Sequence, residues 1–404
     1  MTAPTQSAGG RTDAPPRSAF TARITLGRVF PSASSNYYLL LGVTLFMVIF
    51  GLIMVLSSSS VDSHTDGGSF FSRFLSQGMF AAIGIPLMLL TSLVPAAWWK
   101  RLAWPMLIVS CLLQAVTVFT GLGLRINQNK NWLQVAGIAF QPSELIKISL
   151  VLWLGMFVAL KWDKIKQWKY GLLPICLVSA VAIGLVLAGG DLGTTLVMAA
   201  IVLGAMFLIG IPLRQLVTTA LIATGIALLF AVSRASRLER ILSYLHPSAS
   251  DPSSTGWQMQ QSNFGLARGG IFGVGLGNST SKWNWLPASS TDFIFSIIGE
   301  ELGLIGAVIV LGLFVFLAII LIRIMNASTD PFPRTVTAAV LVWLLGQALV
   351  NIGVVLGLVP TLGVPLPLIS AGGTALISSL FAIGVVLSFA RMPAAQATRR
   401  NEQQ

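Results

Sequence analysis

The sequence predicts an all-α polytopic membrane protein, and three observations carry that prediction. Charged residues are only 9% of the 404 residues, whereas hydrophobic residues are 55%, and the mean hydropathy is +0.83. A soluble fold with so few charges could not cover its surface, because globular proteins use roughly a quarter charged residues. The apolar residues also come in long unbroken blocks, which excludes the alternating strands of a transmembrane β-barrel.

Ten apolar blocks are long enough to cross a bilayer, which requires about twenty residues. The fifth to seventh blocks are joined by very short connections, and residues 37–390 together form one ten-helix membrane domain. The predicted spans lie at roughly 37–56, 74–94, 102–121, 143–160, 171–188, 193–211, 214–232, 293–322, 335–358 and 369–390.

Both ends of the chain are predicted to lie in the cytoplasm. An even number of spans places the two ends on one side of the membrane, and the segments of that side carry about twice as many Lys and Arg residues as those of the other. Residues 1–36 are rich in Ser, Pro and Ala and predict a disordered tail, and residues 391–404 form a second tail. The net charge of +12 is therefore a topology signal, and no nucleic-acid partner is expected.

Two long loops are then extracytoplasmic, at 122–142 and, between the seventh and eighth spans, at 233–292. Connections longer than about 12–15 residues are uncommon and usually functional. The second loop mixes Trp257, Trp283 and Trp285 with Arg and Gln, a composition typical of short segments at the lipid interface.

Four ionisable residues lie inside predicted spans, where such groups are costly and are functional candidates. Glu144 and Lys147 are three residues apart on one helix face, so they can pair with each other or share a cavity. Glu300 and Glu301 either form internal ion pairs or serve the function of the protein.

Two aspartates begin predicted spans. Asp191 begins the sixth and Asp292 the eighth. From the residues alone, a helix cap is the default interpretation of each.

The connection to the last span is rich in Pro and Gly and includes Ser370, Gly372 and Gly373. It predicts either a tight turn or a cavity wall whose free N–H groups suit an anion such as phosphate. Cys111 and Cys176 lie in apolar blocks, which leaves no cysteine framework for a disulfide or a zinc site.

Several motifs, taken in order along residues 37–390, resemble those of the SEDS family, the FtsW, RodA and SpoVE proteins of bacterial division, elongation and sporulation. The segment at 51–57 and the Gly-Leu-Gly-Asn-Ser block are most similar to the FtsW branch. The motifs are Gln-Pro-Ser-Glu at 141–144 with Lys147, Asp-Leu-Gly-Thr at 191–194, Gly-Trp-Gln at 256–258 with Gln261, Gly-Leu-Gly-Asn-Ser at 275–279 with Lys282, Thr-Asp-Phe-Ile-Phe at 291–295, Gly-Glu-Glu-Leu-Gly at 299–303, and the stretch from Asn351 to Ala375.

The resemblance implies a multi-pass glycosyltransferase of the bacterial plasma membrane that polymerises lipid II, an undecaprenyl-pyrophosphate-linked disaccharide-peptide, into peptidoglycan strands outside the membrane. It implies work at the division septum with a class B penicillin-binding protein, which crosslinks the strands, and with other divisome membrane proteins. Asp292 matches the essential aspartate of the family, which replaces the interpretation as a cap.

The reaction needs a base near the attacking sugar hydroxyl and positive charge near the departing pyrophosphate. Asp292 is the candidate catalytic residue. No cofactor is assigned beyond an optional divalent cation, Mg²⁺ or Mn²⁺, whose ligands stay unknown. The candidate substrate-binding residues are Lys282, Arg240, Arg268, Gln258, Gln261, Glu144, Lys147, Glu300, Ser370, Gly372 and Gly373.

The chain departs from the family pattern before Asp292. Ala288 replaces a glutamate and Ser290 a histidine, and Asn131-Trp132 stands where the family has Arg-Trp. Two alternatives stay open: a flippase that moves lipid II between leaflets, and a non-catalytic division scaffold. A flippase needs polar groups through the full depth of the membrane, whereas a carboxylate at the rim suits chemistry.

Overall fold

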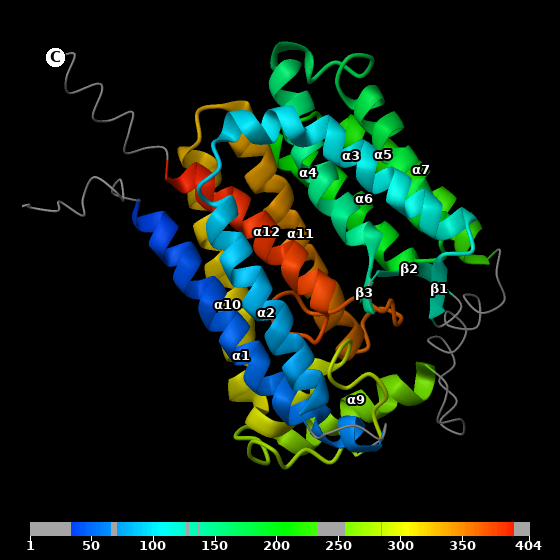
Figure 1. Ribbon diagram of the computed structural model, residues 1–404, viewed down its shortest axis with the longest axis vertical. Coiled ribbons are helices and arrows are strands. Elements are labelled where there is room, and N and C mark those ends of the chain that lie inside the picture. The colour runs from blue at the N-terminus through cyan, green and yellow to red at the C-terminus, as the bar shows by residue number, and fades with distance from the viewer. Residues whose placement is uncertain are drawn as a thin grey trace, which may run out of the picture.

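The computed structural model describes residues 34–65, 71–126, 129–135, 137–232, 255–283 and 285–391, and within them the chain is a bundle of long helices (Figure 1). The predicted tails lie almost entirely outside the described residues, as does the part of the long loop that contains Arg240. The helices of the bundle are α1 (Ser35–Thr65), α2 (Ser72–Thr91), α3 (Ala96–Phe119), α4 (Pro142–Leu160), α5 (Leu172–Ala188), α6 (Leu192–Ile209), α7 (Leu213–Val232), α10 (Ile294–Ala327), α11 (Pro331–Val355) and α12 (Gly373–Ala390).

These helices match the ten predicted spans one for one. In the described part of the chain, nine of them are long and apolar enough to cross a membrane, and α5 is a shorter apolar helix of 17 residues. The chain is thus an all-α multi-pass membrane protein, as the composition predicted.

Several helices begin where their first residues satisfy the free N–H groups of a helix start. Asp191 caps α6 by accepting from the Thr194 N–H at 2.9 Å, and Asp330 caps α11 by accepting from the Phe332 N–H at 2.8 Å. Helix α4 begins with Pro142, whose missing N–H costs nothing at that position. The cap predicted at Asp191 is confirmed.

The start of α1 and the end of α12 lie at the same end of the bundle (Figure 1), where the Ser34 hydroxyl donates to the Ala390 carbonyl at 2.8 Å. The opposite end carries helix α9 (Thr255–Gly269) and a small sheet. We call this opposite end the α9 end.

The segment expected as a plain loop at 122–142 contains a three-stranded antiparallel sheet of β1 (Gly123–Ile126), β2 (Asn129–Val135) and β3 (Ile138–Phe140). Its strands have three to seven residues, too few for a period-two pattern to stand out in the sequence. The Lys130 N–H donates to the Gly189 carbonyl at 2.8 Å, which fixes the sheet to the end of α5.

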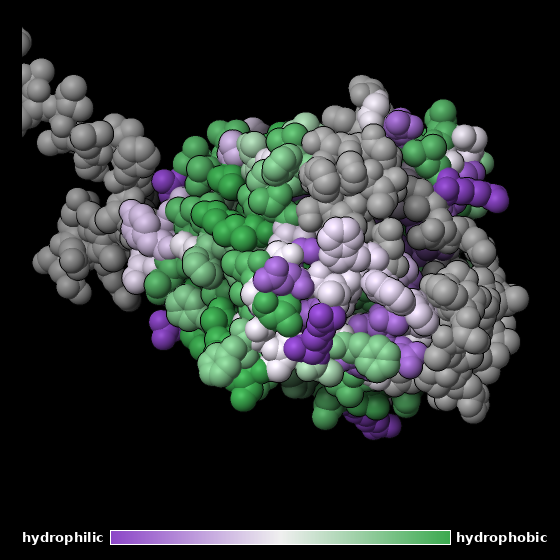
Figure 2. Space-filling model, turned by 90° about the horizontal axis from the view of Figure 1, so that it is seen from below, coloured by the Kyte–Doolittle hydropathy of each residue, from purple (hydrophilic) through white to green (hydrophobic). Residues whose placement is uncertain are grey.

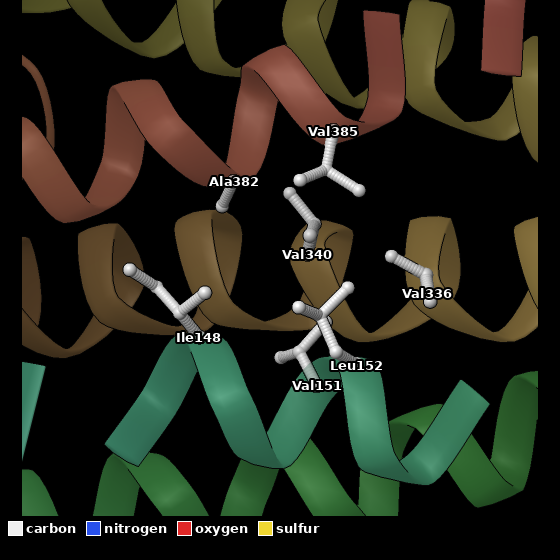
Figure 3. Close-up of a pocket in the computed structure, with 7 residues that line it drawn as sticks. All are labelled: Ile148, Val151, Leu152, Val336, Val340, Ala382 and Val385. Carbon is white, nitrogen blue, oxygen red and sulfur yellow. The ribbon is translucent and has the colours of Figure 1, made fainter. Parts of the chain in front are cut away.

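The centre of the bundle is formed by α4, α11 and α12, most of whose residues are buried. A small cavity between these three helices has an entirely aliphatic lining (Figure 3). Because it offers no polar partner, it suits neither water nor a reacting group. The lining residues are Ile148, Val151, Leu152, Val336, Val340, Ala382 and Val385.

Helix α10 differs from the continuous span that was expected, because it is broken at Gly303. Gly303 has φ 68° and ψ −164°, a backbone conformation that a side chain would strain. A Cβ there would also lie 2.4 Å from the Gly273 nitrogen. Residues 294–302 therefore form a half-helix that is separate from the long remainder of α10, and Glu300 and Glu301 belong to this half-helix.

Candidate functional site

Asp292 lies at the α9 end, immediately before the half-helix of α10, and is half-buried. The residue that caps α10 is Phe293, and no side-chain hydrogen bond caps the helix. Asp292 therefore lies one residue before the N-cap position that the residues alone suggested for it.

The backbone at Asp292 is held by α11. The side-chain amide nitrogen of Asn351 donates to the Asp292 carbonyl at 2.7 Å and to the Val364 carbonyl at 2.8 Å. Asn351 is 1% exposed. A Cβ on Gly363, which has φ 68°, would lie 3.8 Å from the Asp292 Oδ2. The motif from Asn351 to Ala375 thus folds directly against the catalytic candidate, and we call its part between α11 and α12, residues 356–372, the signature loop.

A tight turn leads into Asp292. Ala288 has a positive φ of 58°, which is unusual for a residue with a side chain. Its carbonyl accepts hydrogen bonds from the Thr291 N–H at 3.1 Å, the Phe293 N–H at 3.3 Å and the Thr291 hydroxyl at 3.2 Å. Ala288 and Ser290, the two departures from the family pattern that precede Asp292, are therefore both part of this turn.

Helix α2 and the start of α12 enclose the same turn. The Arg73 guanidinium donates to the Ser290 hydroxyl at 3.3 Å, and the Ala371 N–H donates to the Ser290 carbonyl at 2.9 Å. The Arg73 cation therefore contacts a residue that lies two positions before Asp292 in the chain. Arg73 was not predicted as a site residue, because it lies in none of the motifs.

The predicted anion site before α12 is largely used by the protein itself. Gln77, one turn along α2 from Arg73, donates to the Ser370 carbonyl at 3.1 Å and accepts from the Gly372 N–H at 3.2 Å. The Ser370 hydroxyl accepts from the Leu366 N–H at 2.8 Å. A Cβ on Gly373 would lie 2.3 Å from the Phe80 ring, so this glycine permits close packing. The N–H groups of Ala371 and Gly372 thus have protein partners, and the expectation of free donors there does not hold for them.

Glu144 and Lys147 form the predicted ion pair, with 2.8 Å between the Lys147 Nζ and the Glu144 Oε1. Both side chains are buried, and the Ser378 hydroxyl donates to Glu144. The Lys147 Nζ also donates to the Gln347 Oε1 at 3.3 Å, and Gln347 in turn donates to the Pro365 carbonyl at 2.9 Å. The ion pair is therefore connected through Gln347 to the signature loop and is buried beneath it, so it does not line an exposed surface.

Asp191 belongs to the same region. Besides capping α6, its carboxylate accepts from the Gln141 amide at 3.0 Å and from the Thr194 hydroxyl at 2.8 Å. Burial raises the pKa of Asp191 above its usual range, although the hydrogen bonds from Thr194 and the charge of Lys147 oppose the rise.

Glu300 is fully buried and is bound by one turn of the loop that precedes Asp292. Its carboxylate accepts from the Ser279 hydroxyl at 2.6 Å, the Thr280 N–H at 2.9 Å, the Thr280 hydroxyl at 3.0 Å and the Ser281 N–H at 3.3 Å. A carboxylate that accepts this many hydrogen bonds is satisfied without a cation. Glu300 is thus placed to hold the loop.

Glu301 is also fully buried and pairs with Lys282. The Lys282 Nζ lies 3.4 Å from the Glu301 Oε1 and donates to the Gly277 carbonyl at 2.6 Å. The Ser57 hydroxyl contacts both carboxylate oxygens of Glu301, at 2.7 and 2.6 Å. Lys282 is only 4% exposed, so the structure places this predicted phosphate ligand inside an ion pair.

The remaining candidates lie on α9. Gln258 and Gln261 are half-buried, and Arg268 is exposed and donates to the Thr280 hydroxyl. Figure 2 shows this end of the molecule, with hydrophilic residues gathered in the middle of the face between hydrophobic ones.

In the described ranges, no three His, Cys, Asp or Glu side chains converge on a point that could hold a metal ion. The divalent cation considered from the sequence stays a prediction, because Mg²⁺ is often held by only one or two carboxylates together with substrate phosphates.

Comparison with known proteins extends over nearly the whole chain. The sequence model of the FtsW, RodA and SpoVE family, described as "Cell cycle protein", matches residues 37–394. The chain is 38% identical over 376 residues to the "Probable peptidoglycan glycosyltransferase FtsW" of Mycobacterium tuberculosis, covering 93% of this chain and 70% of that protein. It is 37% identical over 353 residues to the protein of the same name from Trichlorobacter lovleyi, covering 86% and 92%.

A solved structure agrees with the fold. A chain in the structure described as "Structural coordination of polymerization and crosslinking by a peptidoglycan synthase complex" superposes with a TM-score of 0.70 and 28% identity, over 90% of this chain and all of that one.

Proposed function

The chain belongs to the family of FtsW, RodA and SpoVE cell cycle proteins, and we propose that it polymerises lipid II at the outer face of the plasma membrane during cell division. It is a peptidoglycan glycosyltransferase, as its FtsW-named relatives are. The observation that carries the proposal is the position of Asp292, which is half-buried at the rim of the bundle on a backbone fixed by Asn351.

In the proposed reaction, a sugar hydroxyl attacks the anomeric carbon of a second lipid-linked sugar. The bond from that carbon to the pyrophosphate breaks as the new glycosidic bond forms, and the polyprenyl pyrophosphate leaves with the electron pair. Asp292 accepts the proton of the attacking hydroxyl as general base. The contact of Asn351 that fixes its backbone to α11 favours this role, because a base must keep its position relative to the reacting atoms.

The negative charge that develops on the pyrophosphate needs a cation nearby. We assign this role first to Arg73, because it is half-buried at the α9 end and contacts the turn that ends at Asp292. Arg268 is exposed on the same end and is a second candidate. Arg240 remains a candidate from the sequence alone. Lys282 acts indirectly, by holding the loop through Glu301.

This function requires the α9 end to face outward. The distribution of Lys and Arg supports that orientation, since it favours cytoplasmic termini and the start of α1 and the end of α12 lie opposite α9. A class B penicillin-binding protein is the proposed partner at the septum, with other divisome membrane proteins. The solved complex that coordinates polymerisation and crosslinking supports such a pairing.

A flippase is the rival function, and the contacts of the buried ionisable groups count against it. Glu144 pairs with Lys147, Glu301 pairs with Lys282, and Glu300 is saturated by a loop turn. Ionisable groups that are paired with fixed internal partners are suited to holding helices and loops in place. They are less suited to lining a path along which a charged headgroup passes.

The test supplies the purified protein and its partner synthase in proteoliposomes, and measures glycan polymer and lipid II translocation separately. We expect the wild type to make polymer from lipid II already on the accessible leaflet, and Asp292→Ala to make none. Translocation that depends on the protein, without any polymer, would support the flippase instead. If neither activity is present, the scaffold remains.

A further inference from the structure

The break in α10 leaves backbone groups that a continuous helix would satisfy, and residues 270–276 supply their partners. The Leu304 N–H donates to the Gly270 carbonyl at 2.9 Å, and the Ile305 N–H donates to the Ile271 carbonyl at 3.3 Å. In the other direction, the N–H groups of Val274 and Gly275 donate to the carbonyls of Glu300 and Glu301, both at 3.0 Å. We call residues 270–276 the wedge segment.

The backbone of the wedge segment packs directly against the backbone of α10 at the break. Gly273 has φ 79°, and a Cβ there would lie 2.2 Å from the Glu301 carbonyl oxygen. Gly303 makes the matching close approach from α10. Since neither glycine tolerates a side chain, the two backbones stay in contact. The wedge segment therefore lies at the same depth along the membrane normal as the break in α10.

The length of α10 places the break and the wedge segment at the boundary of the hydrocarbon core. Arg323 is exposed near the opposite end of the helix, where a cation is expected at the polar boundary. A hydrocarbon core requires about twenty helical residues, and that length from Arg323 reaches Gly303. Backbone at this depth must be paired inside the protein, as the wedge segment pairs it.

The side chains of the wedge segment are all apolar, and all except the half-buried Val274 are exposed. Ile271 is 61% exposed, Phe272 81% and Leu276 57%. They continue an exposed apolar surface on α10 that begins at Leu304, 58% exposed, and Ile305, 46% exposed. Because that surface of a membrane-spanning helix faces lipid, the adjoining wedge side chains meet the same environment.

We propose that the wedge segment inserts into the membrane at the α9 end and that Ile271, Phe272 and Leu276 bind the acyl chains of that leaflet. The loop turn that follows is bound to Glu300 and leads to Asp292. The inserted segment therefore sets the height of the catalytic candidate above the hydrocarbon. The partner is a lipid surface, and the inference does not depend on the proposed chemistry.

Site-directed spin labelling in lipid nanodiscs, without partner proteins, tests this. Nitroxides are placed at Phe272→Cys and Leu276→Cys in a background lacking Cys111 and Cys176, and relaxation by oxygen is compared with relaxation by a water-soluble nickel chelate. Phe316→Cys, on the exposed surface of α10, is the lipid control. Asn278→Cys, exposed two residues beyond the wedge segment, is the water control.

We expect Phe272 and Leu276 labels to give an oxygen-to-nickel ratio several-fold above that at Asn278 and close to that at Phe316. Ratios equal to that at Asn278 at both positions would overturn the proposal, because they would place the wedge segment in water. Two label sites guard against a local disturbance by either one.

Discussion

The side chain of Asn351 donates to the carbonyl oxygens of Asp292 and Val364 at the same time, at 2.7 and 2.8 Å. Because both partners are acceptors, the position requires a donor with two N–H groups, and aspartate cannot replace it. This one contact joins α11, the signature loop and the catalytic candidate.

Asn351→Asp is therefore expected to disrupt the site more than Asn351→Ala. The carboxylate would face two carbonyl oxygens, whereas alanine only leaves them unpaired. Unpaired buried groups cost about 1–3 kcal/mol, and displacement of the base can lower the rate about a hundredfold. Thermal unfolding in detergent and polymerisation rates measure the two effects. An Asn351→Asp enzyme with wild-type activity would exclude this positioning role.

Arg73 is expected to bind substrate rather than to stabilise the fold. Arg73→Ala removes a charge-assisted contact worth about 1.5–3 kcal/mol, so the KM for lipid II should rise about tenfold or more, and Arg73→Lys should recover part of the loss. Arg101→Ala, at the opposite end of the bundle, is the matched control. Kinetics of Arg73→Ala that equal those of Arg101→Ala would remove Arg73 from the site.

The Lys282–Glu301 pair is expected to show strong coupling, because both side chains are almost fully buried. Removing one partner leaves an uncompensated charge and should destabilise the protein by about 3–5 kcal/mol. Lys282→Met with Glu301→Gln should cost less than the sum of the two single changes. Additive losses in a double-mutant cycle would mean that the two groups act independently.

The buried carboxyl of Asp191 is expected to make the free energy of unfolding depend on pH. Burial raises its folded pKa above the unfolded value, so the folded protein binds the proton more tightly. Its contribution is fully present below the ordinary carboxyl pKa of about 4 and is lost as pH rises through the raised folded pKa. Asp191→Asn, which can still accept from Thr194, should flatten this part of the profile. Identical profiles for both proteins would contradict the assignment.

The sequence was sufficient for the membrane bundle, because each span is a long apolar block whose signal does not depend on its neighbours. The cap at Asp191 and the Glu144–Lys147 pair were also accessible, since both are local in the chain. The small sheet was not, because its strands are too short to show a pattern.

The other contacts of the site join distant segments, and no local pattern encodes them. Arg73 and Ser290 are 217 residues apart, and Gln77 and Ser370 are 293 apart. Lys282 was expected at the substrate because a lysine near the membrane surface suits a phosphate, and nothing nearby in sequence indicated its burial against Glu301. The break at Gly303 depends on the wedge segment, which a helical pattern cannot show.

The most direct test of the central claim is the rate of glycan-strand formation by Asp292→Asn with its partner synthase and lipid II. Asparagine keeps the size of the side chain and leaves the Asn351 contact to the backbone intact, so only the basic carboxylate is lost. We predict a rate lower by about 10²–10⁴-fold, as expected when a general base is removed, with unchanged thermal stability. Polymer formed at the wild-type rate would show that Asp292 is not the base.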